Sequence, residues 1–76
     1  MLFFYDTDDG HREIEDGVGV ELSGEAEAVQ QAVALLRDLS HAGAELGEPR
    51  TFSVRVRGAD GEAAYAASLR LEIRRA

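Results

Sequence analysis

Apolar and polar residues alternate along the last third of the chain, a pattern typical of strands with one buried face. Residues 51–57, TFSVRVR, place one Phe and two Val on one side and Thr, Ser and two Arg on the other. Residues 63–73 alternate over a greater length, and the sequence Gly-Ala-Asp-Gly at 58–61 separates the two runs. The pattern therefore predicts a β-hairpin. Its second strand has an apolar face made of Ala63, Tyr65, Ala67, Leu69, Leu71 and Ile73.

Residues 24–44 show a helical pattern instead. Their apolar residues recur three and four positions apart, which places them on one face of a helix. We expect Val29, Val33 and Leu36 to lie on this buried face. Ser23 is the predicted N-cap, because a serine hydroxyl accepts hydrogen bonds from the free N–H groups of a first helical turn. Glycines and the one proline that follow favour an end near the last residue of this range.

The N-terminal segment predicts a second hairpin. Residues 2–7, LFFYDT, are rich in strand-forming aromatic residues, Asp9-Gly10 is a strong turn signal, and residues 12–16 can return as a strand. The order is β-β-α-β-β, which predicts one α+β domain over residues 1–76, with one antiparallel sheet and a single helix packed on one face. The strand residues expected beneath the helix are Phe52, Val54, Leu69 and Leu71.

The net charge of −7 is unevenly distributed. Residues 1–48 hold twelve acidic residues and two arginines, whereas residues 49–76 hold six arginines and three acidic residues. The negative total argues against nucleic-acid binding and favours solubility or a basic partner. The absence of cysteine excludes disulfides and thiolate metal sites. No segment approaches the roughly 20 apolar residues of a membrane span, so we expect a cytoplasmic protein that binds no membrane.

The stretch DTDDGHRE, residues 6–13, is the most chemically varied part of the chain. A calcium loop of the EF-hand type needs acids at positions 1, 3 and 5, glycine at 6 and glutamate at 12. Counted from Asp6, however, Gly10 falls at position 5 and Gly17 at position 12. Aspartate and glycine are also the residues that tight turns require. We interpret this stretch as a hairpin turn and expect neither a metal nor a cofactor.

A catalytic reading of the same stretch is weaker. His11 beside Asp9 could act as a general base with an orienting carboxylate. The other histidine, His41, lies near the end of the predicted helix, and no serine or cysteine stands in a nucleophile motif. A small enzyme with a histidine–aspartate site in the first hairpin therefore ranks behind two non-catalytic hypotheses, and we predict that the protein is not an enzyme.

The first non-catalytic hypothesis is a protein-interaction domain that associates with itself or docks on another protein, through its open sheet face or through an edge strand. Phe3 and Tyr5 alternate with Phe4, so one set must leave the helix-covered core, and an exposed aromatic patch indicates a partner site. Arginines that oppose the apolar residues of the last two strands belong to the open sheet face, which lacks the exposed aromatics of RNA-binding sheets. A homodimer is the commonest way to cover such a face. The predicted interaction face is Phe3, Tyr5, Arg55, Arg57, Arg70 and Arg74.

The second hypothesis is an acidic inhibitor that imitates nucleic acid and blocks a nuclease or another DNA-binding protein, as phage and mobile-element proteins do. It requires a basic partner and binding that weakens steeply with salt. The acidic surface predicted for this role is Asp6, Asp8, Asp9, Glu13, Glu15 and Asp16.

These motifs also occur together in one known arrangement. An aromatic pair and an aspartate in the first strand precede a D-G turn, the element D-x-x-G-x-E-L and an Ala-rich helix, and a second D-G turn precedes an L-x-L strand. In this arrangement the chain resembles a family of small bacterial proteins, common in soil alphaproteobacteria, that is classed as a domain of unknown function. The resemblance implies the architecture and a bacterial source, and no activity. The residues that carry it are Phe3, Phe4, Asp6, Asp9, Gly10, Asp16, Gly19, Glu21, Leu22, Asp60, Gly61, Leu69 and Leu71.

Overall fold

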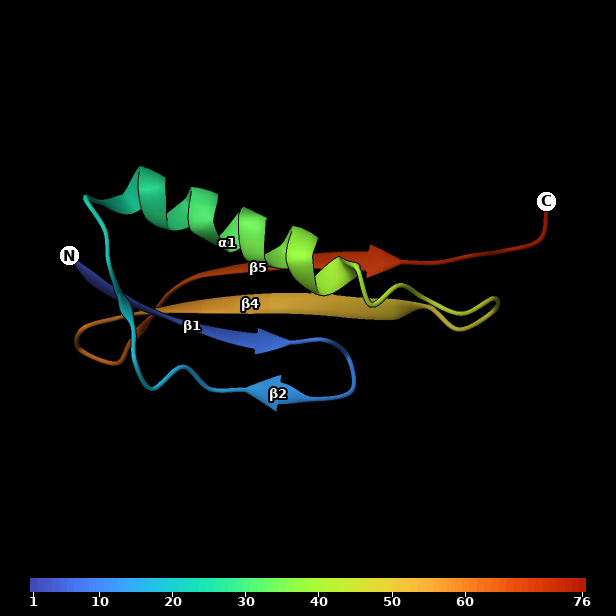
Figure 1. The fold of residues 1–76 in the computed structure, drawn as a ribbon, viewed down its shortest axis with the longest axis horizontal. Coiled ribbons are helices and arrows are strands. Elements are labelled where there is room, and N and C mark those ends of the chain that lie inside the picture. The colour runs from blue at the N-terminus through green and yellow to red at the C-terminus, as the bar shows by residue number, and fades with distance from the viewer.

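The computed structural model describes residues 1–76 and has two layers, an antiparallel sheet and one helix that covers one of its faces (Figure 1). The fold class predicted from the sequence is confirmed. The order along the chain is β-β-β-α-β-β, which has one short strand more than predicted. The elements are β1 (Leu2–Asp8), β2 (Glu13–Ile14), β3 (Val20–Glu21), α1 (Glu25–Ser40), β4 (Arg50–Gly58) and β5 (Ala63–Leu71).

The strand order in the sheet is β2-β1-β4-β5, and β3 pairs with the other end of β1. The two hairpins thus meet through β1 and β4, which run antiparallel with Tyr5 opposite Val56. On its other side β4 pairs with β5, where Val56 lies opposite Tyr65 and the register shifts after Val56. β5 pairs with β4 alone, so the outer side of this nine-residue strand is an edge of the sheet.

The core lies between the inward face of the sheet and one ridge of α1. Alternate residues of β1 and β4 share that face, which confirms the alternation predicted for residues 51–57. On the helix the buried positions recur every four residues, and two of the three are alanines that let the helix lie close to the strands. The buried residues are Phe3, Tyr5, Ala28, Ala32, Leu36, Phe52, Val54 and Val56.

The predicted helix face is wrong at two of its three positions. Leu36 is buried as predicted, but Val29 and Val33 are 42% and 40% exposed. The buried ridge lies one residue earlier along the helix because the small alanine side chains, rather than the valines, meet the sheet. Leu69 was also expected beneath the helix and is 38% exposed, since it lies on an edge strand with a neighbour on one side only.

The ends of α1 also differ from the predicted range of 24–44. The N-cap is Gly24, and no side chain caps the helix. The predicted N-cap, Ser23, instead donates from both its N–H and its hydroxyl to the Glu27 carboxylate one turn into the helix. At the other end α1 stops four residues early, and Gly43 turns the chain away with a φ of 73°. With these bounds α1 is neither long nor apolar enough to cross a membrane.

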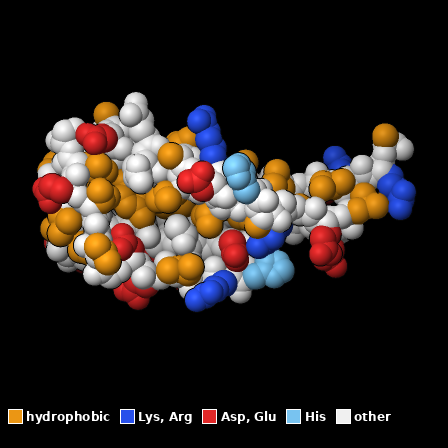
Figure 2. All heavy atoms as spheres, in the orientation of Figure 1, with side chains coloured by type: hydrophobic (Ala, Val, Ile, Leu, Met, Phe, Trp, Pro, Cys, Tyr) orange, Lys and Arg blue, Asp and Glu red, His pale blue; other side chains and the backbone are white.

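Beyond the end of α1 the molecule narrows (Figures 1 and 2). The loop that leads into β4 runs beside the end of the chain, where the Gly47 N–H donates to the Ile73 carbonyl over 3.0 Å. Leu46 and Ile73 form a parallel bridge there and are 49% and 47% exposed. This narrow end therefore carries apolar side chains that the helix does not cover.

Candidate functional site

The stretch at residues 6–13 is a hairpin turn, as predicted. The Asp8 carboxylate accepts a hydrogen bond from the Gly10 N–H over 2.8 Å, and the Asp9 carboxylate accepts from the N–H groups of His11 and Arg12 over 2.9 and 2.7 Å. Gly10 has a φ of 91°, and a Cβ there would lie 3.0 Å from a carbonyl oxygen of β4. The two aspartates therefore satisfy the backbone of a tight turn that only glycine can complete.

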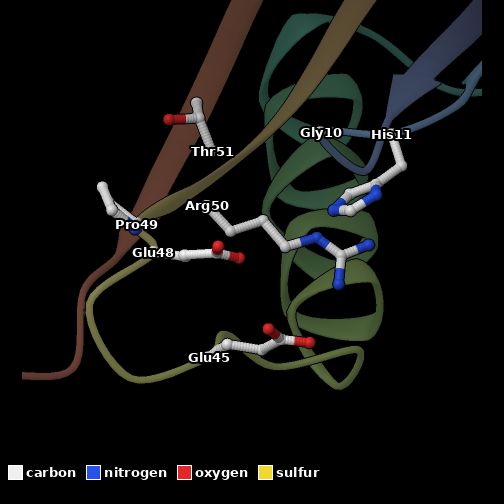
Figure 3. A pocket seen from close by; sticks show the side chains of 7 residues that line it. All are labelled: Gly10, His11, Glu45, Glu48, Pro49, Arg50 and Thr51. Carbon is white, nitrogen blue, oxygen red and sulfur yellow. The ribbon is translucent and has the colours of Figure 1, made fainter.

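A polar pocket of about 240 Å³ lies between this turn and the loop before β4 (Figure 3). His11 and Arg50 lie next to each other on one side, and Glu45 and Glu48 reach the pocket from the loop. The bond between His11 and Asp9 is made by the His11 backbone N–H, so this carboxylate does not orient the imidazole. Three metal-ligating side chains do not converge here or elsewhere in the structure.

Arg50 has a structural role at this pocket, where it holds three segments of the chain together. Its Nε donates to the Asp9 carbonyl over 2.6 Å and its Nη1 to the Gly43 carbonyl over 3.3 Å, while its guanidinium lies 5.0 Å from the centre of the Phe52 ring. Its Nη2 is 3.5 Å from the Asp9 carboxylate. One side chain thus joins the first hairpin, the segment after the helix and β4, and few of its donors are left for a ligand.

A second arginine organises the open face of the sheet. Arg57 Nε lies 2.7 Å from Asp6 Oδ2 and its Nη2 lies 3.0 Å from Asp6 Oδ1, a bidentate pair in which both side chains are four-fifths or more buried. Nη2 also donates to the Asp16 carbonyl over 2.8 Å, and the guanidinium lies 5.0 Å from the centre of the Phe4 ring. The hydrogen bond from Arg57 holds the pKa of Asp6 below its usual value and raises the pKa of Arg57.

Asp16 completes this arrangement. Its carboxylate accepts from the N–H of Tyr5 in β1 over 3.0 Å and from the N–H groups of Val18 and Gly19 over 2.9 and 3.0 Å. These three N–H groups lower the pKa of Asp16, the one from Tyr5 most strongly. Its own N–H donates to Asp6. We call Asp6, Asp16 and Arg57 the clip, because together they fasten the segment between β2 and β3 to the sheet.

The predicted acidic surface is only partly available to a partner. Four of its six residues accept hydrogen bonds from the protein's own N–H groups: Asp6, Asp8, Asp9 and Asp16. Hydrogen bonds lower the pKa values of Asp6, Asp9 and Asp16. In Asp9 the N–H of the next histidine has the largest effect. The other two, Glu13 and Glu15, are exposed. The negative charge of this hairpin is therefore partly committed to holding its fold.

The predicted interaction face is wrong for its aromatic members. Phe3 and Tyr5 are 4% and 7% exposed, and the Tyr5 hydroxyl donates to the carbonyl of Ala28 in α1 over 2.8 Å. The strand alternates as predicted, but the pairing of β1 with β4 turns these two residues toward the helix and leaves Phe4 on the open face. Arg57 is held in the clip. Three predicted members remain exposed: Arg55, Arg70 and Arg74.

The sequence analysis allowed a contact through an edge strand but did not identify the surface beside the edge of β5. α1 packs on both β4 and β5. Burial raises the pKa of Tyr65, and the Glu25 carboxylate of α1, which lies close to the tyrosine hydroxyl, raises it further. Glu25, Val29 and Val33 are four residues apart and form one ridge, which therefore runs over β5. We call the outer edge of β5, this ridge and Leu69 the β5 side. Its sequence signal is a nine-residue strand, AAYAASLRL, with a single charge.

These observations define a small two-layer α+β domain in which most of the chemically distinctive side chains hold loops to the sheet. The family model of a domain of unknown function (DUF6894) matches residues 2–70, and the chain belongs to that family. The match includes the helix and every strand except the last residue of β5, which confirms the predicted resemblance to a domain of unknown function. Comparisons with curated proteins and with solved structures give no match.

Proposed function

We propose that this domain is a non-catalytic protein-interaction module that associates with itself through the β5 side. The observation that carries the proposal is the unpaired edge of β5, which is nine residues long. An edge of this length presents a row of free N–H and C=O groups, and monomeric proteins ordinarily protect such edges with proline, lysine, bulges or a covering segment. The outer edge of β5 has no proline, no lysine and no covering segment, its one irregularity is the register shift at Ala64, and Arg70 is its one charged residue.

The ridge above this edge supports the same proposal. Val29, Val33 and Leu69 are each about two-fifths exposed, although they lie around one strand rather than at scattered positions. Apolar residues gathered beside free backbone groups suit a second strand, which pairs with the edge and covers the side chains at once. The first hairpin, by contrast, is highly charged and its strand β2 has only two residues.

The acidic inhibitor is the alternative function. It is less well supported, because the clip and the turn use four of the six predicted acidic residues. Cytoplasmic location and the alphaproteobacterial source implied by the resemblance belong to the same proposal. A cytoplasmic domain without cysteine can associate only through non-covalent contacts of the kind described above.

Light scattering over a concentration series tests the proposed function. We expect the mass to rise from 8.2 kDa to twice that value as the concentration reaches about a hundred micromolar. Val33→Lys should weaken the association, because it places a charge on the ridge. The control is Val18→Lys, at a residue that is 87% exposed in the segment between β2 and β3. A mass of 8.2 kDa throughout the series, or equal weakening by both variants, would overturn the proposal.

A further inference from the structure

We infer that the edge of β5 is covered by the segment that follows β5 in a second copy of this chain. We call this segment, residues 72–76, the tail. The two copies exchange tails about a two-fold axis at Leu71, and each tail runs antiparallel to the β5 edge of the other copy. This inference rests on the proposed function and adds to it the covering segment. The tail projects beyond α1 in Figure 1, and the molecule is 45 Å long but 22 and 16 Å across.

The strand is regular where this pairing uses it. Its register with β4 is unbroken from Tyr65 to Leu71, and its one shift lies before this range. The Ile73 carbonyl accepts a hydrogen bond from the Gly47 N–H on the β4 side. Since backbone groups of alternate residues point to opposite sides of a strand, those of Arg70 and Glu72 point outward, where an antiparallel neighbour can bond to both.

Charge selects the position of the axis. Arg70 and Arg74 lie 3.6 and 3.5 Å from Glu72, so these three side chains share the open face of the sheet. An axis at Leu71 places Arg70 of each copy opposite Glu72 of the other, and the symmetry makes this contact twice. An axis at Arg70 or at Glu72 places like charges opposite each other, which is repulsive. An axis at either of the two residues before Arg70 leaves both charges opposite neutral residues.

Apolar side chains separate the axis at Leu71 from an axis at Ile73, which also pairs opposite charges. The axis at Ile73 places Leu71 opposite Arg75 of the second copy, so an apolar residue meets a charge. The axis at Leu71 places Leu69 opposite Ile73 instead, and Leu71 meets its own symmetry mate. Apolar pairs directly across neighbouring strands stabilise a sheet, so the axis at Leu71 satisfies both faces.

The exchanged tail also accounts for three exposed apolar side chains. Leu69, Val33 and Ile73 are 38%, 40% and 47% exposed in the single chain. Glu25 lies close to the Tyr65 hydroxyl, and from there α1 and β5 run in the same direction (Figure 1). Val33 is about 12 Å further along the helix and Leu69 about 14 Å further along the strand, so the two lie at the same level. Ile73 of the second copy therefore lies next to both.

The rest of each chain leaves room for the exchange. The loop that bonds to Ile73 lies on the β4 side of the tail, so the outer side of the tail is open. The acidic hairpin lies at the opposite side of the sheet, where β2 is three strand positions, or about 14 Å, from β5. This distance exceeds the screening length of about 8 Å at physiological salt. The net charge of −7 per chain therefore does not prevent the contact.

A charge exchange between chains tests the inference. Arg70→Glu and Glu72→Arg each place like charges at both contacts, so each variant alone should dimerise about fivefold to tenfold more weakly than the unchanged chain. The mixed dimer of the two variants, measured by fluorescence anisotropy with one of them labelled, should recover the affinity, because both contacts then join opposite charges. The pair within each chain stays disrupted in the mixture, so recovery reports contact between chains. The control is a mixture of Arg74→Glu with Glu72→Arg, which restores both contacts only for an axis at Ile73.

Disulfide trapping locates the axis independently, because the chain has no cysteine of its own. Leu71→Cys places two thiols opposite each other, within the Cα separation of about 4.4–6.8 Å that a disulfide spans. Ile73→Cys is the control on the same face, since its symmetry mate would be about 14 Å away. We expect a covalent dimer from Leu71→Cys under mild oxidation and none from Ile73→Cys. If Leu71→Cys does not fold, the charge exchange decides the result.

Recovery in the control mixture, or stronger trapping of Ile73→Cys than of Leu71→Cys, would overturn the inference. A dimer by light scattering that shows neither recovery nor trapping would refute the tail exchange and leave the proposed function standing. A monomer at every concentration would refute both.

Discussion

Removing the Asp16 carboxylate should unfold the segment between β2 and β3 and lower the stability of the whole domain. Asp16→Ala leaves the N–H groups of Tyr5, Val18 and Gly19 without their acceptor. It also removes one of the carboxylates near Arg57, whose charge Asp6 and the more distant Glu15 must then balance. Because Tyr5 belongs to β1, the loss reaches the sheet and is not confined to the loop.

The expected cost follows from the three bonds. A hydrogen bond to a charged group contributes about 1.5–3 kcal/mol, and an exposed N–H that water can satisfy contributes less. Val18 is exposed and the other two N–H groups are partly buried, so we expect a total of about 2–4 kcal/mol. A domain of this length is stable by roughly 4–11 kcal/mol. The loss should therefore lower Tm by roughly 10–30 °C.

Urea and thermal unfolding at pH 7, followed by circular dichroism, measure this loss. Glu15→Ala is the matched control, because the neighbouring Glu15 side chain is 82% exposed and lies 3.9 Å from the same arginine. It should change the free energy of unfolding by less than about 0.5 kcal/mol. Asp16→Asn keeps one acceptor oxygen and should fall between the two. If Asp16→Ala is no more destabilising than Glu15→Ala, the clip does not hold the fold as described.

Three further predictions use the same unfolding assay. Leu36→Ala should lower the free energy of unfolding by about 2–5 kcal/mol and Val33→Ala by less than about 1 kcal/mol, because only Leu36 is buried. Equal losses would mean that the buried ridge is misassigned. Gly19→Ala should lower the free energy of unfolding by about 1–3 kcal/mol, because the φ of Gly19 is 79° and a Cβ would lie 2.9 Å from an aromatic ring carbon. Gly17→Ala, with open space around it, should leave the stability nearly unchanged. A Gly19→Ala variant of unchanged stability would contradict the steric reasoning. The folded-state pKa of Asp6 lies below its usual 3.8, so the stability it contributes is present above that pH and is lost as the pH falls further. Asp6→Asn should therefore reduce the decline in the free energy of unfolding between about pH 5 and pH 2. An unchanged decline would exclude this carboxylate as its cause.

The fold class follows from the sequence because the spacing of apolar residues in each helix or strand depends on that element alone. Alternation in residues 51–57 needs no information beyond the strand itself, and the structure buries the three residues that alternation selects, Phe52, Val54 and Val56. The D-G turns were predictable for the same reason, since Gly10 and Gly61 have φ values of 91° and 84°. Strand alternation and turn conformation are therefore independent of how the rest of the chain packs.

Local spacing does not determine which face of a strand or helix packs against the core. Alternation correctly separates Phe3 and Tyr5 from Phe4, but the choice between the sets depends on which strand β1 joins and in which register. The helix raises the same problem, because alanines and valines lie on adjacent ridges of nearly equal apolar character. Ala28 and Ala32 are the buried residues because α1 lies close to the sheet. The spacing of hydrophobic residues in the sequence does not reveal how close the helix lies.

Strand order explains why the β5 side was not predicted. From the sequence alone, β5 could lie at the centre of the sheet or at its edge, and its alternating pattern suits both. The order β2-β1-β4-β5 makes it an edge and thereby turns an unremarkable alanine-rich strand into an open surface. The candidate arginine face failed in part for a related reason, since Arg57 became a partner of Asp6 only when β1 and β4 were joined.

Four of the thirteen residues on which the predicted resemblance rests lie in the clip or in the packing around it. Phe4, Asp6, Asp16 and Gly19 contact one another or share Arg57 as a partner, so the D-x-x-G-x-E-L element describes how a loop is fastened to a sheet. Membership of the family therefore carries the fold without carrying a function. The clip lies on the β1 half of the sheet and the proposed interface on the β5 half. A clip variant that stays folded at the assay temperature should then dimerise normally, whereas a β5-side variant should lose association without losing stability.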